Sequence, residues 1–209
     1  GTAVVIFQPA EEGGAGGLAM VEDGLMERFA IDEVYGMHNM PGIPVGDFAM
    51  RPGPIMAATD EFRITVNGVG GHAARPHGTI DPILVGTALV QALQSIVSRS
   101  VNPIDSAVVS VTRFHAGEAT NVIAETAEIA GTARTLKPEI RDLVERRMGE
   151  IVAGLAAAHG TTIDLAYRRN YPVTRNHAAQ VGFAAEVAAE IVGESRVDTD
   201  VPPLMGGED

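Results

Sequence analysis

The stretch VVIFQPAEEG at residues 4–13 decides how the rest of the chain is interpreted. Four apolar residues run into a proline, and a glycine-rich turn follows the two glutamates. A continuous apolar run that ends in Pro and Gly is typical of a parallel strand buried on both faces. The run therefore predicts an α/β fold in which Glu11 and Glu12 emerge at the carboxyl edge of the sheet, where ligands bind. Two adjacent carboxylates repel each other at such a place, so the pair indicates a bound metal cation.

Composition limits the class of protein. The chain has 209 residues, a formal net charge of −12 and 45% hydrophobic residues, which is enough for a core. The acidic balance argues against nucleic acid and anionic membranes as partners, because both need basic surfaces. The sequence contains no cysteine, which excludes disulfides and thiolate ligands within it and favours a reducing, cytoplasmic compartment. We expect no membrane span, since no run approaches about 20 consecutive apolar residues.

The first segment, residues 1–58, predicts part of an α/β domain. Apolar residues at helical spacing predict a helix over residues 16–28, and a short strand is expected over residues 31–37. Strand, helix and strand form a right-handed βαβ unit, which brings His38 to the same sheet edge as the glutamate pair. A short hairpin is expected around residues 45–50.

The second segment, residues 59–172, predicts a ferredoxin-like α+β domain. Its first strand alternates apolar and polar residues, and Asp81-Pro82 is typical of a helix cap followed by a first-turn proline. The order β-α-β-β-α-β is that of the ferredoxin-like fold. The expected elements are strands at 60–67, 107–114, 121–134 and 161–167, and helices at 83–97 and 138–158.

The third segment, residues 173–209, predicts a return to the first domain. We expect Asn176 to cap a helix over residues 178–192, followed by a strand over residues 197–205. The layout is therefore one α/β domain interrupted by an inserted α+β domain. Because the sequence lacks an initiator methionine and begins beside a predicted core strand, we expect an internal piece of a longer protein that lacks site residues at both ends.

The glutamate pair allows more than one interpretation. Paired carboxylates are most often solvated surface charge, and a lone histidine is more often structural than a ligand. One carboxylate and the imidazole of His38 would suit a zinc-like ion, which would leave the second carboxylate as a base. The glycine turn at residues 14–19 also fits G-x-G-x-x-A, with Glu33 placed for a ribose. Carboxylates directly before that turn would repel a pyrophosphate, which disfavours nucleotide binding.

The inserted domain carries further polar candidates. His72 and His77 flank a turn, where their ordinary role is hydrogen bonding within the loop. They could reach a metal site only across a cleft or from another subunit. Asn121 and Arg134, near the start and end of one predicted strand, could bind a carboxylate.

Six motifs then occur in order: QPAEEG, GMHNMPG, GGHAARPH, GEATNVI, GTARTL and a terminal GGED. Together they resemble the metal-dependent amidohydrolase family that includes aminoacylases, carboxypeptidases and succinyl-diaminopimelate desuccinylase. The closest resemblance is to the branch of hippurate hydrolases and auxin-amino-acid-conjugate hydrolases, and it covers essentially the whole chain. It implies a mixed-sheet, metallo-exopeptidase-like catalytic domain at residues 1–58 and 173–209, interrupted by a lid and dimerisation domain at residues 59–172.

The resemblance also implies roles for single residues. Glu11 matches the general base and Glu12 a metal ligand, whereas His38 matches the histidine ligand that replaces an aspartate of other branches. His72 matches a histidine that reaches a neighbouring subunit's active site and polarises the scissile carbonyl. The other matches are substrate-binding residues, with Gly207 at a position where the family usually has serine: Asn121, Arg134, Gly206, Gly207 and Glu208.

The implied cofactor is one or two divalent ions of zinc, manganese, cobalt or nickel, and the implied substrate is an N-acyl amino acid. A homodimer through the lid domain is implied, with no nucleic-acid or membrane partner. Nothing in the sequence matches the family's upstream Cys/His metal motif or its final histidine ligand. A catalytic zinc needs about three protein ligands, so with Glu12 and His38 alone this chain is expected to bind metal poorly and to be inactive. The alternative is a dimerising or binding module without catalysis.

Overall fold

The structure, a computed structural model, describes residues 1–11 and 13–209. The chain forms two compact units. Unit 1 comprises Gly1–Ala57 and Thr174–Asp209, and unit 2 comprises Ala58–Val173, so unit 2 is inserted into unit 1 in the sequence. Both units contain helices and strands, and the fold is of the mixed α/β class.

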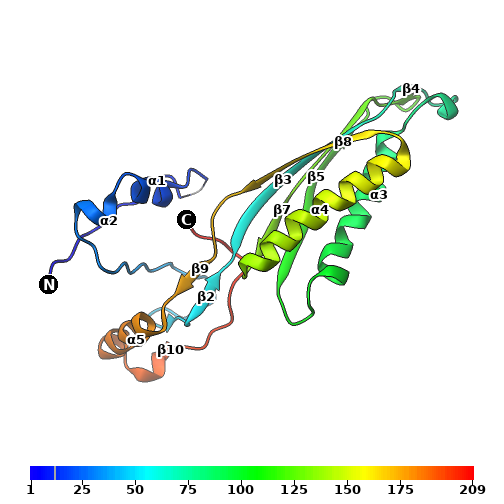
Figure 1. Cartoon of the computed structure of the whole chain (residues 1–209). Helices are drawn as coiled ribbons and strands as arrows, with labels where there is room; N and C mark the ends of the chain where they lie inside the picture. The colour runs from blue at the N-terminus through cyan, green and yellow to red at the C-terminus, as the bar shows by residue number, and fades with distance from the viewer. Residues whose placement is uncertain (12) are drawn as a thin grey trace. The chain divides into compact units, whose positions relative to one another are not determined.

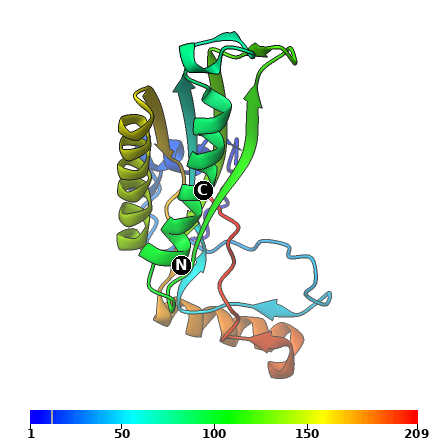
Figure 2. The same cartoon turned by 90° about the vertical axis from the view of Figure 1, so that its right-hand side faces the viewer.

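Unit 2 is built on one long antiparallel sheet. Its main elements are β3 (Ala58–Asn67), α3 (Pro82–Ser95), β5 (Ala107–Ala116), β7 (Thr126–Thr135), α4 (Pro138–His159) and β8 (Thr162–Arg169). The strands pair in the order β5-β7-β3-β8, and every neighbouring pair is antiparallel. Helices α3 and α4 lie on one face of this sheet (Figures 1 and 2). The element order β-α-β-β-α-β is that of the ferredoxin-like motif.

The core of unit 2 lies between the sheet and the two helices. Alternation in β3 buries Phe62, Ile64 and Val66 against the helices and leaves Glu61 and Arg63 exposed on the other face. Helix α3 begins after Asp81, whose carboxylate accepts hydrogen bonds from the amides of the first helical turn. The side chains that complete the core from the helices are Val85, Leu89, Leu93, Ile96, Ile140, Val144, Met148 and Val152.

The π-helical segment η2 (Ile96–Ser100) extends α3, and together they form a 19-residue helix over Pro82–Ser100. By length and composition alone this helix could cross a membrane. Leu89, Leu93 and Ile96 are fully buried in the core of unit 2, which is the arrangement of an ordinary core helix. Shorter elements of unit 2 are β4 (Gly71–His72), β6 (Val122–Ile123) and η1 (Pro76–Gly78).

Unit 1 contains shorter elements. Its bounds are α1 (Gly16–Glu22), α2 (Leu25–Arg28), β1 (Phe48–Ala49), β2 (Gly53–Met56), β9 (Thr174–Asn176), α5 (Ala178–Val192), η3 (Glu194–Arg196) and β10 (Val197–Asp198). β1 pairs in parallel with β10, and β2 pairs with β9 in the antiparallel sense. The helix expected over residues 16–28 is broken into α1 and α2, with Gly24 at a φ of 82° before α2.

Two predicted strands and a predicted hairpin are wrong. Residues 4–7 and 31–37 have no regular secondary structure, and Val5 and Phe7 are 76% and 87% exposed. A strand needs a hydrogen-bonded neighbour, and no segment that the structure describes pairs with either stretch. The expected βαβ unit is therefore not formed by this chain. The hairpin around residues 45–50 is replaced by β1, whose partner is the distant β10.

The predicted cap and tail of the third segment also need correction. His177 occupies the N-cap of α5 without a side-chain hydrogen bond, whereas Asn176 lies in β9. The Asn176 amide is committed elsewhere, because its Nδ2 donates to the Arg51 carbonyl at 3.1 Å. The tail forms only the short β10 and an isolated parallel bridge between Met56 and Leu204.

Candidate functional site

Three carboxylates of unit 1 form the carboxylate cluster, which consists of Glu11, Glu208 and Asp209. One oxygen atom from each residue lies within 4.8 Å of the others, and all three residues are half-buried. Like charges at this separation repel one another, which is an energetic cost of holding three carboxylates together. A divalent cation removes that cost, and carboxylate oxygens are ligands that such ions accept.

The loop that carries Glu11 approaches other backbone closely. A Cβ added at Gly16 would lie 1.6 Å from the Pro9 carbonyl oxygen, so only glycine fits there. Ala10 and Ala15 have φ values of 55° and 51°, in a region that residues with a Cβ seldom adopt. Such backbone strain concentrates at functional sites and persists only where surrounding contacts hold it.

Asp209 is held by two donors from the first segment. The Gly17 amide donates to Asp209 Oδ2 at 2.9 Å, and the Gln8 side-chain amide donates to Asp209 Oδ1. Gln8 belongs to the QPAEEG stretch, and its hydrogen bond to Asp209 is a structural role that the sequence did not predict. Asp209 itself was also missed, although it is the last letter of the GGED motif.

His38 lies beside the carboxylate cluster. Its Nε2 is 3.7 Å from Glu208 Oε2, and its Nδ1 is 2.6 Å from the carbonyl oxygen of Asn39. A carbonyl only accepts, so Nδ1 donates that hydrogen bond. With Nδ1 as the donor, Nε2 is the ring nitrogen on the side of Glu208 and the one that would bind a metal.

The remaining residues predicted for unit 1 are placed as follows. Glu12, predicted as a metal ligand, lies outside the described residues. The Gly206 carbonyl accepts from the Ala57 amide at 2.7 Å, which fixes the segment before the carboxylate cluster beside β2. Gly207 and Glu208 follow directly and are half-buried. Within unit 1 the structure thus brings Glu11, His38 and Glu208 together.

The predicted residues of unit 2 fall into two places. His72 in β4 is paired with Val122 of β6, and the Ala73 amide donates to the Asn121 carbonyl at 3.0 Å. Arg134 lies at the other end of the sheet, where it pairs with Thr59, whereas β7 begins at Thr126. Eight residue steps along a strand span about 27 Å. One copy of unit 2 therefore does not bring Arg134 to the same small ligand as His72 and Asn121.

Comparison with known proteins identifies the family of this chain. The sequence profile of peptidase family M20/M25/M40 matches residues 1–209. Hippurate hydrolase of Campylobacter jejuni is 45% identical over 203 residues, which is 97% of this chain and 53% of that protein. N-acetyldiaminopimelate deacetylase of Streptococcus sanguinis is 42% identical over 206 residues, covering 98% of this chain and 54% of the deacetylase. The chain spans about half the length of the curated relatives it matches.

A solved structure agrees with the sequence relatives. A dinuclear metal-binding peptidase of family M20 from Bacillus subtilis superposes with a TM-score of 0.76 at 33% identity, covering 97% of this chain and 49% of that one. The motifs, the mixed α/β fold and the full-length profile match agree with one another, and the named relatives are hydrolases. The chain belongs to peptidase family M20/M25/M40.

Proposed function

We propose that this chain is part of a metal-dependent amidohydrolase that cleaves the amide bond of N-acyl amino acids. The observation that carries the proposal is the convergence of Glu11, His38 and Glu208 within unit 1. The names of two relatives support the substrate class, because a hippurate hydrolase and an N-acetyldiaminopimelate deacetylase both split an acyl group from an amine. The acyl group is benzoyl in one name and acetyl in the other, so the shared element is the N-acyl amino acid.

The residues present fit a divalent cation. Carboxylate oxygens and one imidazole nitrogen form a donor set that zinc, manganese, cobalt and nickel accept. We assign Glu12 and His38 as ligands, and Glu208 and Asp209 lie close enough to Glu11 to border the same ion. When bound, the cation would polarise the scissile carbonyl and lower the pKa of an attacking water. One or two ions in the longer protein agree with the dinuclear relative.

The protein side chains perform the proton transfers and the positioning. Glu11 takes the proton from the attacking water and returns it to the amine that leaves. His72 donates to the carbonyl oxygen as negative charge develops on it. Arg134 binds the α-carboxylate of the substrate with its guanidinium, while Asn121 lies beside His72 and binds the same end of the substrate as that histidine. Gly206 and Gly207 leave room for the substrate next to Glu208.

The separation within unit 2 supports a two-subunit active site. Arg134 lies near the end of β7, about 27 Å along the strand from its first residue, Thr126, whereas His72 lies in β4 and pairs with Val122, which precedes β7. In a symmetric dimer one end of unit 2 can serve its own subunit and the other end the partner. Unit 2 is then the lid and dimerisation domain. The dimer contact is offered by edge strand β5 and by α3 with the start of η2, since residues 82–98 include no charged residue.

We also propose a cytoplasmic location, with which the absence of cysteine from the sequence agrees.

A mixed-dimer experiment tests the two-subunit site. In a protein of the relatives' length that contains this chain, His72→Ala should lower kcat by about 10² to 10³-fold with a small effect on KM. Mixing this variant with an equal amount of Glu11→Gln should restore about a quarter of wild-type activity. About half of the dimers are then mixed, and each mixed dimer contains one intact site out of two. The measurement is hippurate hydrolysis after the two variants are unfolded and refolded together.

His77→Ala is the matched control, since His77 lies close in sequence, in η1, and has no assigned part in the reaction. It should leave kcat within about twofold of wild type. No recovery in the mixed sample would contradict the cross-subunit role of His72. A protein that dimerises in sedimentation but hydrolyses no N-acyl amino acid would favour the alternative, a dimerising module without catalysis.

A further inference from the structure

The face of the unit 2 sheet that carries Arg63 and Arg113 has a hollow of about 530 Å³. Its charged lining is one-sided, because it contains four arginines and one glutamate in a chain whose net charge is −12. We call the hollow and its arginines the arginine face. The residues that decide its chemistry are Glu61, Arg63, Arg113, Ala130, Arg134 and Arg168.

The strand register places two of these arginines on either side of a small residue. Arg63 on β3 and Arg113 on β5 are both paired with Ala130 on the central strand β7. Neighbouring strands lie about 4.8 Å apart, so the two arginine backbones are about 10 Å apart across Ala130. Arg63 faces a second alanine, Ala166, on β8. Small residues between long side chains leave the space that the hollow occupies.

These two arginines lack the carboxylate partners that Arg141 and Arg169 of the same unit have. Among the described residues, neither Arg63 nor Arg113 donates a side-chain hydrogen bond or forms an ion pair. Three carboxylates lie near these arginines on the same face: Glu61 on β3, Glu128 on β7 and Asp164 on β8. None of them forms an ion pair with Arg63 or Arg113.

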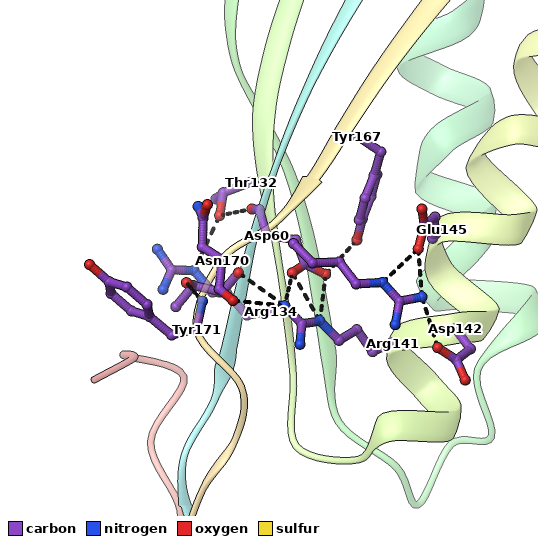
Figure 3. Close-up of polar contacts among 11 residues, drawn as sticks. Asp60, Thr132, Arg134, Arg141, Asp142, Glu145, Tyr167, Asn170 and Tyr171 are labelled. Carbon is purple, nitrogen blue, oxygen red and sulfur yellow. Dashed lines mark hydrogen bonds and ion pairs between the residues drawn. The ribbon is translucent and has the colours of Figure 1, made fainter. Parts of the chain in front are cut away.

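The contrast within the same unit is direct. On the helix-covered side, Arg141 binds the buried carboxylate of Asp60, and Arg169 reaches both Asp142 and Glu145 (Figure 3). The other two arginines of the arginine face, Arg134 and Arg168, also form no ion pair among the described residues. Arg168 is paired across the sheet with Glu61, and Arg134 Nε donates to Thr132 Oγ1 at 3.2 Å. All four guanidiniums of the arginine face thus lack an ion-pair partner among the described residues, and Arg63 and Arg113 are the two that flank Ala130.

We infer that the arginine face binds a small anion that carries two or more carboxylates. A guanidinium binds a carboxylate through two parallel N–H···O bonds, and two guanidiniums across an uncharged floor accept two carboxylates of one molecule. Arg134 lines the same hollow and is the residue assigned to the substrate carboxylate in the proposed function, so the test changes only Arg63 and Arg113 and leaves Arg134 intact. Loss of anion binding in that variant and loss of hydrolysis are then separate outcomes.

The probe is tricarballylate, titrated calorimetrically into the metal-free 209-residue chain at low ionic strength. We expect saturable binding with one ligand per chain, and binding of acetate at least about 10-fold weaker, because a monocarboxylate uses only one arginine. The double variant Arg63→Gln with Arg113→Gln should weaken tricarballylate binding by about 10-fold or more. Both positions are exposed on strands, and circular dichroism checks that the variant keeps its fold.

Arg99→Gln is the control, because it removes one positive charge from an exposed arginine of unit 2 outside the hollow, half of the change made by the double variant. It should change tricarballylate affinity by less than about twofold. Equal weakening by Arg99→Gln, or the absence of saturable binding by the wild-type chain, would overturn the site. Self-association that tricarballylate reverses and the double variant abolishes would also overturn it, since a second copy would then cover this face.

Discussion

Glu11→Gln is expected to lower kcat for hippurate hydrolysis by about 10³-fold in a protein of the relatives' length that contains this chain. Glutamine keeps the size of the side chain but cannot take a proton from the attacking water. Because Glu12 and His38 are assigned as the ligands, bound metal should stay at the wild-type stoichiometry. The measurement combines steady-state kinetics with elemental analysis of the purified variant.

The metal content separates two roles for Glu11. Its carboxylate lies within 4.8 Å of oxygens from Glu208 and Asp209, so a ligand role is the competing assignment. A variant that loses metal together with activity would assign Glu11 as a ligand, and retained activity would exclude it as the base. Glu22→Gln is the matched control, since Glu22 ends α1 nearby and is exposed. It should leave kcat and metal content unchanged.

The second large effect concerns a buried ion pair in unit 2. Asp60 is 2% exposed, and its carboxylate accepts from Arg141 Nε at 3.0 and 3.1 Å and from Arg141 Nη2 at 2.5 Å (Figure 3). The Tyr167 hydroxyl donates to the same carboxylate at 2.7 Å. Burial, followed by the bond to Asp60, raises the pKa of the Tyr167 phenol far above its usual value, so the hydroxyl remains a donor. The network joins β3, α4 and β8.

Asp60→Asn should lower the free energy of unfolding by about 3 to 5 kcal/mol, because Arg141 keeps a charge that is buried and no longer neutralised. The measurement is urea denaturation followed by circular dichroism. Replacing both partners, Asp60→Leu with Arg141→Met, should cost much less than the single change, since no charge is left unpaired. Asp142→Asn, at an exposed ion pair with Arg169, should cost less than about 1 kcal/mol. If Asp60→Asn lowers the free energy of unfolding by less than about 1 kcal/mol, the buried ion pair contributes little to stability.

Unit 2 was largely predictable because its signals are local. The alternation of Phe62, Ile64 and Val66 located β3 to within two residues, and Asp81-Pro82 located the start of α3. Each long strand of unit 2 pairs with another strand of the same 116 residues, Ala58–Val173. The apolar faces predicted from the sequence are therefore buried by neighbours within unit 2. The positively charged hollow was not predicted, because it depends on the register that sets Arg63 and Arg113 opposite Ala130.

Unit 1 was predicted less well because its structure depends on distant contacts. The run at residues 4–7 has the composition of a buried strand, yet Phe7 is 87% exposed and no described segment pairs with it. The motif matches named Glu11, His38 and Glu208, and the structure places both Glu11 and His38 near Glu208, while their roles stay predictions. They could not reveal Asp209, because its contact with Gly17 joins residues 192 apart and depends on the fold of both ends of unit 1.

Metal dependence of amide hydrolysis tests the central claim most directly. The protein containing this chain at the length of its relatives should hydrolyse hippurate or an N-acetyl amino acid, lose that activity on dialysis against a chelator, and regain it when zinc or manganese is added back. The same cycle on Glu11→Gln should restore bound metal but not activity. Hydrolysis that survives complete metal removal, or no hydrolysis of any N-acyl amino acid by the metal-loaded protein, would contradict the account.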